Sequence, residues 1–162
     1  MWVRWVRSLI SSTFFSILIN GIRSCPFSPS RGIRQGDPLS PFLFMLMAEG
    51  LGRHIKQALL SQQLKGLSIH NLSAITHQQF VDDNMLFGYP SVQEASLFKS
   101  LLNEFSEASD TSINKAKLQI FFFHTPPVTQ FAIARILGFS IDSLPSKYLR
   151  APLIVSALKH TS

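Results

Sequence analysis

The sequence contains a single cysteine, Cys25, among its 162 residues, and only 15% of these residues are charged. A disulfide framework and a thiolate zinc site both need more than one cysteine, so both are excluded. Hydrophobic residues make up 46% of the chain, a balance unlike that of disordered proteins. The composition therefore predicts one folded domain with a hydrophobic core.

Acidic residues are absent from the first 36 positions, although this segment holds five arginines. It carries a charge of +5 out of a total of +6. A charge concentrated in one segment is typical of a surface that binds phosphate groups, while a solvated basic face is the alternative. The five residues are Arg4, Arg7, Arg23, Arg31 and Arg34.

Long hydrophobic runs are also missing. The apolar stretch 9–19 is interrupted by three serines and a threonine, and it is too short to span a bilayer. Together with Arg4 and Arg7 it resembles a signal peptide, which is a second interpretation of this segment. We favour an intracellular protein, nuclear or cytoplasmic, over a secreted one, and we expect no membrane partner.

Alternating patterns of apolar and polar residues predict an α+β protein in which helices pack on one face of an antiparallel sheet. Asp37 and Pro38 have the residue types of a helix start, and Ser91 with Glu94 forms a capping box before another helix. The expected helices are 2–12, 37–60, about 92–108 and 127–137, and the expected strands are 14–19, 66–70, 73–80, 85–87 and 118–123.

The segment FVDDNMLFG, residues 80–88, predicts a hairpin with polar residues at its tip. Adjacent carboxylates point to opposite faces within a strand, but a turn lets Asp82 and Asp83 project toward one region. Such a pair suits a divalent cation such as Mg²⁺, which prefers oxygen ligands. An ordinary polar turn is the alternative.

The segment RGIRQGDPLSPFLF, residues 31–44, combines arginine, glycine and a helix start. Backbone amides at a helix N-terminus favour anions, and glycine permits close approach of a substrate. The alternative is that this segment merely caps a core helix. The residues expected to face a ligand are Arg31, Gly32, Arg34, Gln35 and Gly36.

These two segments, in this order, resemble the reverse transcriptases of non-LTR (LINE-type) retroelements, especially those of plants. The sequence INKAK, with Asn114 and Lys117, resembles a further element of that family, and so does LPSKYLRAPL, residues 144–153. The resemblance implies a partial right-hand polymerase palm over residues 1–162. This partial domain runs from after the first catalytic aspartate to the primer-grip-like element.

The resemblance also implies roles for individual residues. Asp82 and Asp83 would hold catalytic Mg²⁺, with Mn²⁺ as a possible substitute. The block of residues 31–36 and Lys117 would lie near the incoming nucleotide and the template. Tyr148 and Leu149 would belong to the hairpin that grips the primer. The implied partners are an RNA template, a DNA primer and deoxynucleoside triphosphates.

The sequence departs from the family pattern at several positions. Val81 replaces an alanine, Leu118 replaces a serine, and Arg150 replaces a glycine. If that glycine needs a positive φ, Arg150 strains its turn and weakens the primer grip.

The family also needs an aspartate on an earlier palm strand, and no acidic residue precedes Asp37. We therefore expect a chain that is catalytically incomplete on its own; a non-catalytic nucleic-acid-binding remnant is the alternative. Without the neighbouring strand and the fingers and thumb, unpaired strand edges predict self-association.

Overall fold

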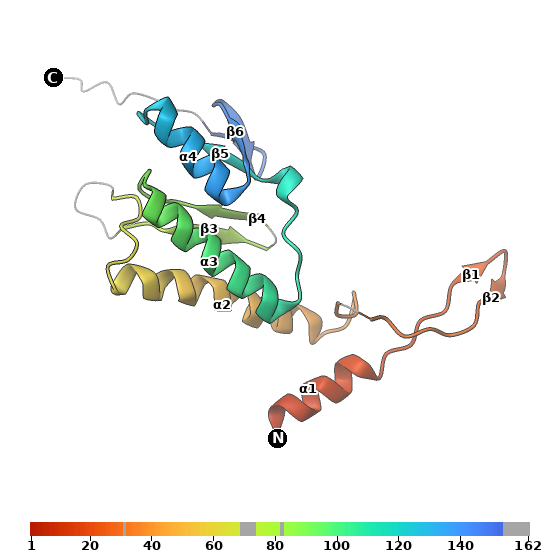
Figure 1. Ribbon diagram of the computed structural model, residues 1–162. Coiled ribbons are helices and arrows are strands. Elements are labelled where there is room, and N and C mark those ends of the chain that lie inside the picture. Colours follow the sequence, from red (N-terminus) through yellow and green to blue (C-terminus); the bar gives the residue numbers. More distant parts are fainter. Residues whose placement is uncertain (31, 69–73, 82, 154–162) are drawn as a thin grey trace. The chain divides into compact units, whose positions relative to one another are not determined.

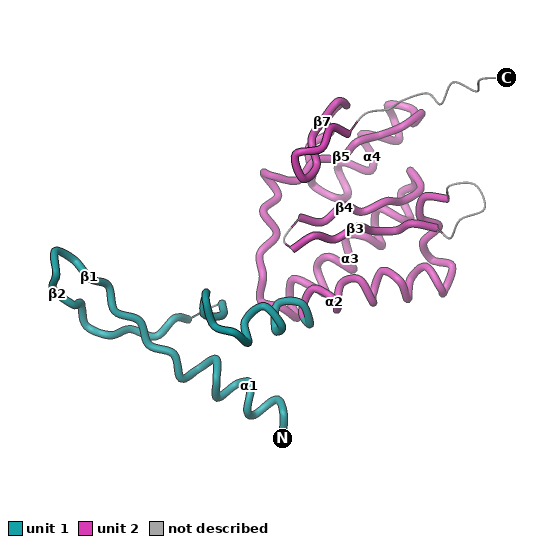
Figure 2. Tube along the Cα trace, turned by 180° about the vertical axis from the view of Figure 1, so that it is seen from behind, with its two compact units in different colours: residues 1–46 teal, residues 47–162 magenta. Residues whose placement is uncertain are grey.

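The computed structural model describes residues 1–30, 32–68, 74–81 and 83–153. The chain divides into two compact units, residues 1–46 and residues 47–162. Their boundary lies within helix α2, which spans Ser40–Leu60 (Figures 1 and 2).

The first unit contains helix α1 (Trp2–Ser11) and a hairpin of two short strands, β1 (Leu18–Ile19) and β2 (Ile22–Arg23). The strands are antiparallel and are joined by Asn20 and Gly21, whose φ angles are 50° and 82°. Positive φ at both central residues is the geometry that favours Asn-Gly in two-residue hairpin turns. The Asn-Gly pair is therefore the local signal for this turn.

The strand predicted over residues 14–19 is shorter than expected, because before Leu18 the only strand-type pairing among the described residues is an isolated bridge between Phe15 and Phe27. Phe15 and Phe27 exchange backbone hydrogen bonds of 2.8 and 2.9 Å, and their ring centroids are 6.2 Å apart. The Ser28 hydroxyl donates to the Thr13 carbonyl at 3.0 Å. Among the described residues of this unit, none is fully buried.

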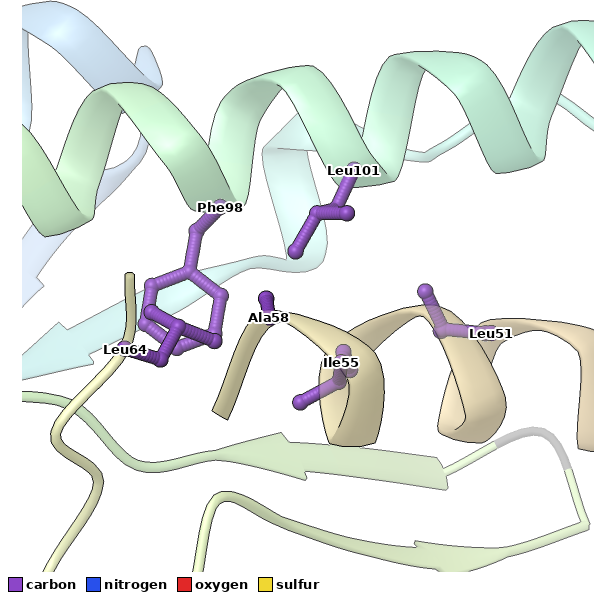
Figure 3. Close-up of a cluster of buried hydrophobic side chains, with 6 residues drawn as sticks. All are labelled: Leu51, Ile55, Ala58, Leu64, Phe98 and Leu101. Carbon is purple, nitrogen blue, oxygen red and sulfur yellow. The ribbon is translucent and has the colours of Figure 1, made fainter. Parts of the chain in front are cut away.

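The second unit has the hydrophobic core, which forms where α2 meets helix α3 (Val92–Ser109). Figure 3 shows Phe98 and Leu101 of α3 extending toward α2. The buried cluster consists of Leu51, Ile55, Ala58, Leu64, Phe98 and Leu101.

The buried residues of α2 all lie toward its C-terminal end and are Ala48, Leu51, Gly52, Ile55 and Ala58. The apolar residues Phe42, Met45 and Leu46 near its start are 64, 66 and 59% exposed. They belong to the unit whose described residues form no buried core. Periodicity of apolar residues predicted the helix correctly, but it did not predict where the core ends.

A hairpin of strands β3 (His77–Phe80) and β4 (Asp83–Leu86) packs next to these helices. Leu86 contacts the core cluster. On the facing helix, a Cβ added at Gly52 would lie only 3.0 Å from Nε2 of His77. The absence of a side chain at Gly52 therefore permits the close approach of α2 to β3.

Helix α4 (Pro127–Leu137) ends at Gly138, which has a φ of 76°, and it matches the helix predicted over 127–137. The Lys99 ammonium of α3 donates to the Ile136 carbonyl of α4 at 2.6 Å. Strand β5 (Gln119–Phe121) precedes α4 and strand β6 (Ser140–Asp142) follows it.

Strands β5 and β6 are parallel, which differs from the antiparallel pairing that we predicted. A helix between two strands allows the chain to return in the same direction, and α4 occupies this position. The sequence prediction identified both the strand and the helix but did not consider this connection.

The described chain ends with the hairpin of β7 (Ser146–Tyr148) and β8 (Ala151–Leu153), and a short 3-10 helix, η1 (Lys115–Lys117), lies before β5. The protein thus mixes helices and strands as predicted. Within the described residues, however, the strands form four two-stranded sheets in place of one larger sheet. In this part of the chain, no helix has the length and apolarity needed to cross a membrane.

Candidate functional site

The β3–β4 hairpin places Asp83 at the first position of β4, where it pairs with Phe80. Val81 follows the last residue of β3 directly, so the turn begins before the predicted polar tip. Val81 has a φ of 54°, a conformation that is rare for a β-branched residue and marks a strained turn. The side chain of Asp83 is exposed.

Asp82 lies outside the described residues, so the expected convergence of its carboxylate with that of Asp83 remains a prediction. Arg31 also lies outside them. Among the residues that the structure does describe, no group of three or more His, Cys, Asp or Glu side chains could hold a metal ion.

Tyr148, from the primer-grip-like element, meets the Asp83 end of the hairpin. Its hydroxyl donates a hydrogen bond of 3.3 Å to the backbone carbonyl of Asp83. Burial, and in second place the negative charge of Asp83, raise the pKa of Tyr148 above its ordinary value of 10.0. The structure thus brings together two sequence elements that were predicted separately.

The β7–β8 hairpin turns at Leu149 and Arg150, which have φ angles of 51° and 67°. This is the left-handed region that favours glycine. We predicted strain at Arg150 if the family's glycine has a positive φ, and the positive φ is present. Leu149 is 41% exposed, and its role at a primer remains a prediction.

Glu94 fixes the opposite end of the β3–β4 hairpin, a function that the sequence prediction missed. This buried side chain, 4% exposed, accepts hydrogen bonds from the backbone amides of Lys65 at 3.0 Å and Tyr89 at 2.8 Å. The Lys65 ammonium also lies 5.1 Å from the centroid of the Tyr89 ring, within the range of a cation–π contact. The predicted capping box was the only signal for Glu94.

Lys117 is exposed at the end of η1. Asn114 caps this short helix, because its side-chain oxygen accepts a hydrogen bond of 3.1 Å from the Ala116 amide. Asn114 therefore has a structural role in presenting the lysine. That Lys117 lies near nucleotide phosphates remains a prediction.

The arginine- and glycine-containing block belongs to the first unit, where it precedes α2. Gly32 and Gly36 have φ angles of 82° and 86°, so both positions favour glycine. The side chains of Arg34 and Gln35 are exposed. Arg34 also contributes to a cavity of about 110 Å³ that is lined by residues of α1, the following strand region and this block.

Asp37 fixes the end of this block, although it is not the helix cap that we predicted. Its Oδ1 accepts a hydrogen bond of 2.7 Å from the Leu39 amide, while the assigned helix begins at Ser40. The Ser40 hydroxyl donates back to the Arg34 carbonyl at 2.6 Å. These two bonds tie the backbone of Arg34 to the start of α2.

Comparison with known proteins adds two findings. The sequence profile described as "Reverse transcriptase (RNA-dependent DNA polymerase)" matches residues 2–149. An uncharacterised mitochondrial protein of Arabidopsis thaliana is 42% identical over 71 residues, which cover 43% of this chain and 58% of that protein. Because the family match spans most of the sequence, the chain belongs to the reverse transcriptase (RNA-dependent DNA polymerase) family.

Proposed function

We propose that this chain is part of the palm of a LINE-type, plant-like reverse transcriptase, and that it supplies one side of the catalytic site. The observation that carries the proposal is the contact between Tyr148 and the Asp83 backbone, because it unites two elements of the family in one place. The order of the sequence elements supports the LINE-type assignment. The plant relative, although uncharacterised, is consistent with it.

In this proposal Asp82 and Asp83 hold the divalent cation that the family uses. The donor chemistry fits, because Asp83 presents an exposed carboxylate beside a tight turn, and carboxylate oxygens are the ligands that Mg²⁺ and Mn²⁺ prefer. A bound cation would supply stabilisation of negative charge on the reacting phosphate oxygens. Exposed Arg34, Gln35 and Lys117 would contact the phosphates of template or nucleotide.

We further propose that the isolated chain does not complete the reaction. Polymerase chemistry by two metal ions requires ligands that hold both ions, and the family takes one ligand from an earlier strand. No Asp or Glu precedes Asp37 in the 162-residue sequence.

Metal binding by the purified chain tests the central part of this proposal. In an electron paramagnetic resonance titration with Mn²⁺, Asp82→Asn and Asp83→Asn should each weaken the affinity at least about tenfold, since even outer-shell changes at metal sites cost about 10–100-fold. Glu107→Gln is the matched control, because it removes one exposed negative charge from α3. Equal affinity in all four proteins would contradict the metal site.

Primer extension tests the incompleteness. With an RNA template, a DNA primer, nucleotides and either Mg²⁺ or Mn²⁺, we expect no incorporation by the isolated chain. Template-dependent incorporation that disappears in Asp82→Ala would overturn this expectation, although it would support the family assignment for the site.

A second candidate function is nucleic-acid binding without catalysis, favoured by the exposed Arg34 and by the charge of +5 on residues 1–36. Replacing Arg31 and Arg34 by Gln should weaken binding to all sequences and reduce the salt slope by up to about two. The control is Arg135→Gln, which removes one positive charge from α4, outside the first 36 residues. An unchanged slope would mean that the segment is a solvated face.

A further inference from the structure

The hydrogen bond between Tyr148 and Asp83 joins two hairpins at the ends next to their turns. Tyr148 is the last residue of β7, and Leu149, with its positive φ, follows it. Asp83 is the first residue of β4 and comes shortly after Val81, which also has a positive φ. The contact bridges residues that are 65 positions apart in the sequence.

A two-stranded hairpin is marginally stable on its own, so contacts with the rest of the unit decide how firmly each end of the β3–β4 hairpin is held. Its far end is held by Leu86, which contacts the core, and by Glu94, which binds the segment after β4. The turn end is less protected, since Phe80 and Val81 are both 58% exposed. Tyr148 supplies a hydrogen bond at this less protected end.

We propose that Tyr148 is a positioning residue for Asp83: its hydroxyl fixes the turn end of the β3–β4 hairpin, so that the β7–β8 hairpin and the Asp83 carboxylate move as one body. This inference rests on the proposed function in assigning metal binding to Asp83 and primer contact to β7–β8. The contact is made to the backbone, so it constrains where the carboxylate lies without occupying its oxygens as metal ligands.

Such a connection would give the primer-gripping hairpin a direct effect on the metal site. A displacement of Tyr148 would shift the carbonyl of Asp83 and with it the strand that carries the carboxylate. Placement of the primer end and placement of the metal would therefore be coupled.

The test is amide hydrogen exchange of the full chain, without metal or nucleic acid, compared between the unchanged protein and Tyr148→Phe. Loss of one hydrogen bond should raise exchange of residues 83–87 about two- to tenfold. Exchange in the core of α2 and α3 should not change. Tyr89→Phe is the matched control, because the contact of Tyr89 with Lys65 is made by its ring and is retained.

A second measurement distinguishes positioning from a purely structural contact. Mn²⁺ affinity should fall about two- to tenfold in Tyr148→Phe, in step with the weakened restraint, while the melting temperature falls no more than in Tyr89→Phe. A local rise in exchange together with lower Mn²⁺ affinity supports the inference. Unchanged exchange at 83–87, a uniform rise throughout the second unit, or an unaltered affinity in a chain that binds Mn²⁺ would each overturn it.

Failure of the proposed function would give a different result. If the unchanged chain does not bind Mn²⁺, the metal site is contradicted. The exchange experiment, which contains no metal, still decides whether Tyr148 fixes the hairpin.

Discussion

Glu94 offers a sharp test of how the second unit is held together, because one buried carboxylate joins two separate backbone segments. Its two oxygens accept hydrogen bonds from Lys65 and Tyr89, which lie on either side of the β3–β4 hairpin in sequence. Glu94→Gln keeps the size of the side chain but replaces one acceptor oxygen by an amide group that donates. One backbone amide then loses its acceptor and faces another donor.

The expected destabilisation follows from the chemistry of these bonds. A hydrogen bond to a charged group contributes about 1.5–3 kcal/mol, and Gln retains one bond in weaker, neutral form. Removing the buried charge also removes its desolvation cost, which offsets that weakening. We therefore expect the free energy of unfolding to fall by about 1.5–3 kcal/mol. For a unit of this size the melting temperature should fall by about 5–12 °C.

Urea denaturation followed by far-ultraviolet circular dichroism measures this change. Tryptophan fluorescence is unsuitable, because both tryptophans, Trp2 and Trp5, lie in the first unit. Glu107→Gln makes the same chemical change on the exposed face of the same helix and should stay within about 0.5 kcal/mol of the original chain. Equal stability of Glu94→Gln and Glu107→Gln would refute the reasoning.

Further predictions concern the two hairpins. Arg150→Gly should stabilise the protein by about 0.5–1 kcal/mol, because glycine adopts the backbone φ of 67° at this position without strain. In the same urea experiment, Arg135→Gly, inside α4, should lower the free energy of unfolding. A loss of stability in both variants would contradict this prediction. Because the pKa of Tyr148 is raised in the folded state, its contribution to the free energy of unfolding is fully present below pH 10.0 and is lost as the pH rises through the higher folded-state value. Tyr148→Phe should therefore lose less stability than the original chain when thermal melts are repeated at increasingly alkaline pH. Equal losses of stability in the two proteins would argue against this prediction. Exposed Phe80, on an edge of the β3–β4 hairpin, should promote association between copies of the chain. Light scattering should therefore show a larger monomer fraction for Phe80→Lys than for the control Val128→Lys, which changes an exposed residue of α4. An original chain that is already monodisperse and monomeric would contradict this prediction.

Local signals in the sequence predicted the elements well. The Asn20-Gly21 turn and the end of α4 at Gly138 both depend on neighbouring residues, and both are present. Asp37, predicted as a helix cap, instead accepts a bond from Leu39 in the turn before α2, which begins at Ser40. The FVDD hairpin is present as well, with its turn shifted toward Val81. Each of these features is determined by backbone conformations that only a few residue types favour.

Features that depend on distant partners were not predicted. Ser91 caps α3 through a bond of 3.2 Å from the Glu94 amide, as expected. The carboxylate of Glu94 does not complete the capping box, because it binds amides of Lys65 and Tyr89 instead. The parallel pairing of β5 with β6 was missed for the same reason, since strand propensity does not specify the partner.

For the candidate site, the family resemblance predicted which elements matter, and the geometry added how two of them meet. The contact of Tyr148 with Asp83 joins positions 65 residues apart, and no sequence pattern specifies such a pair. Because Arg150 replaces a glycine of the family, the sequence predicted strain there if that position had a positive φ, and the φ is positive. The placement of Asp82 and Arg31 remains a prediction.

The separation between Tyr148 and Asp83 also has a consequence for the order in which the protein folds. The β3–β4 hairpin and the cap of α3 close short loops, and such local contacts form rapidly. The Tyr148 bond closes a loop of 65 residues, so it carries a larger entropic cost. During synthesis on the ribosome, the hairpin that bears Asp83 is therefore made early but acquires its last restraint only when residues 146–153 have emerged.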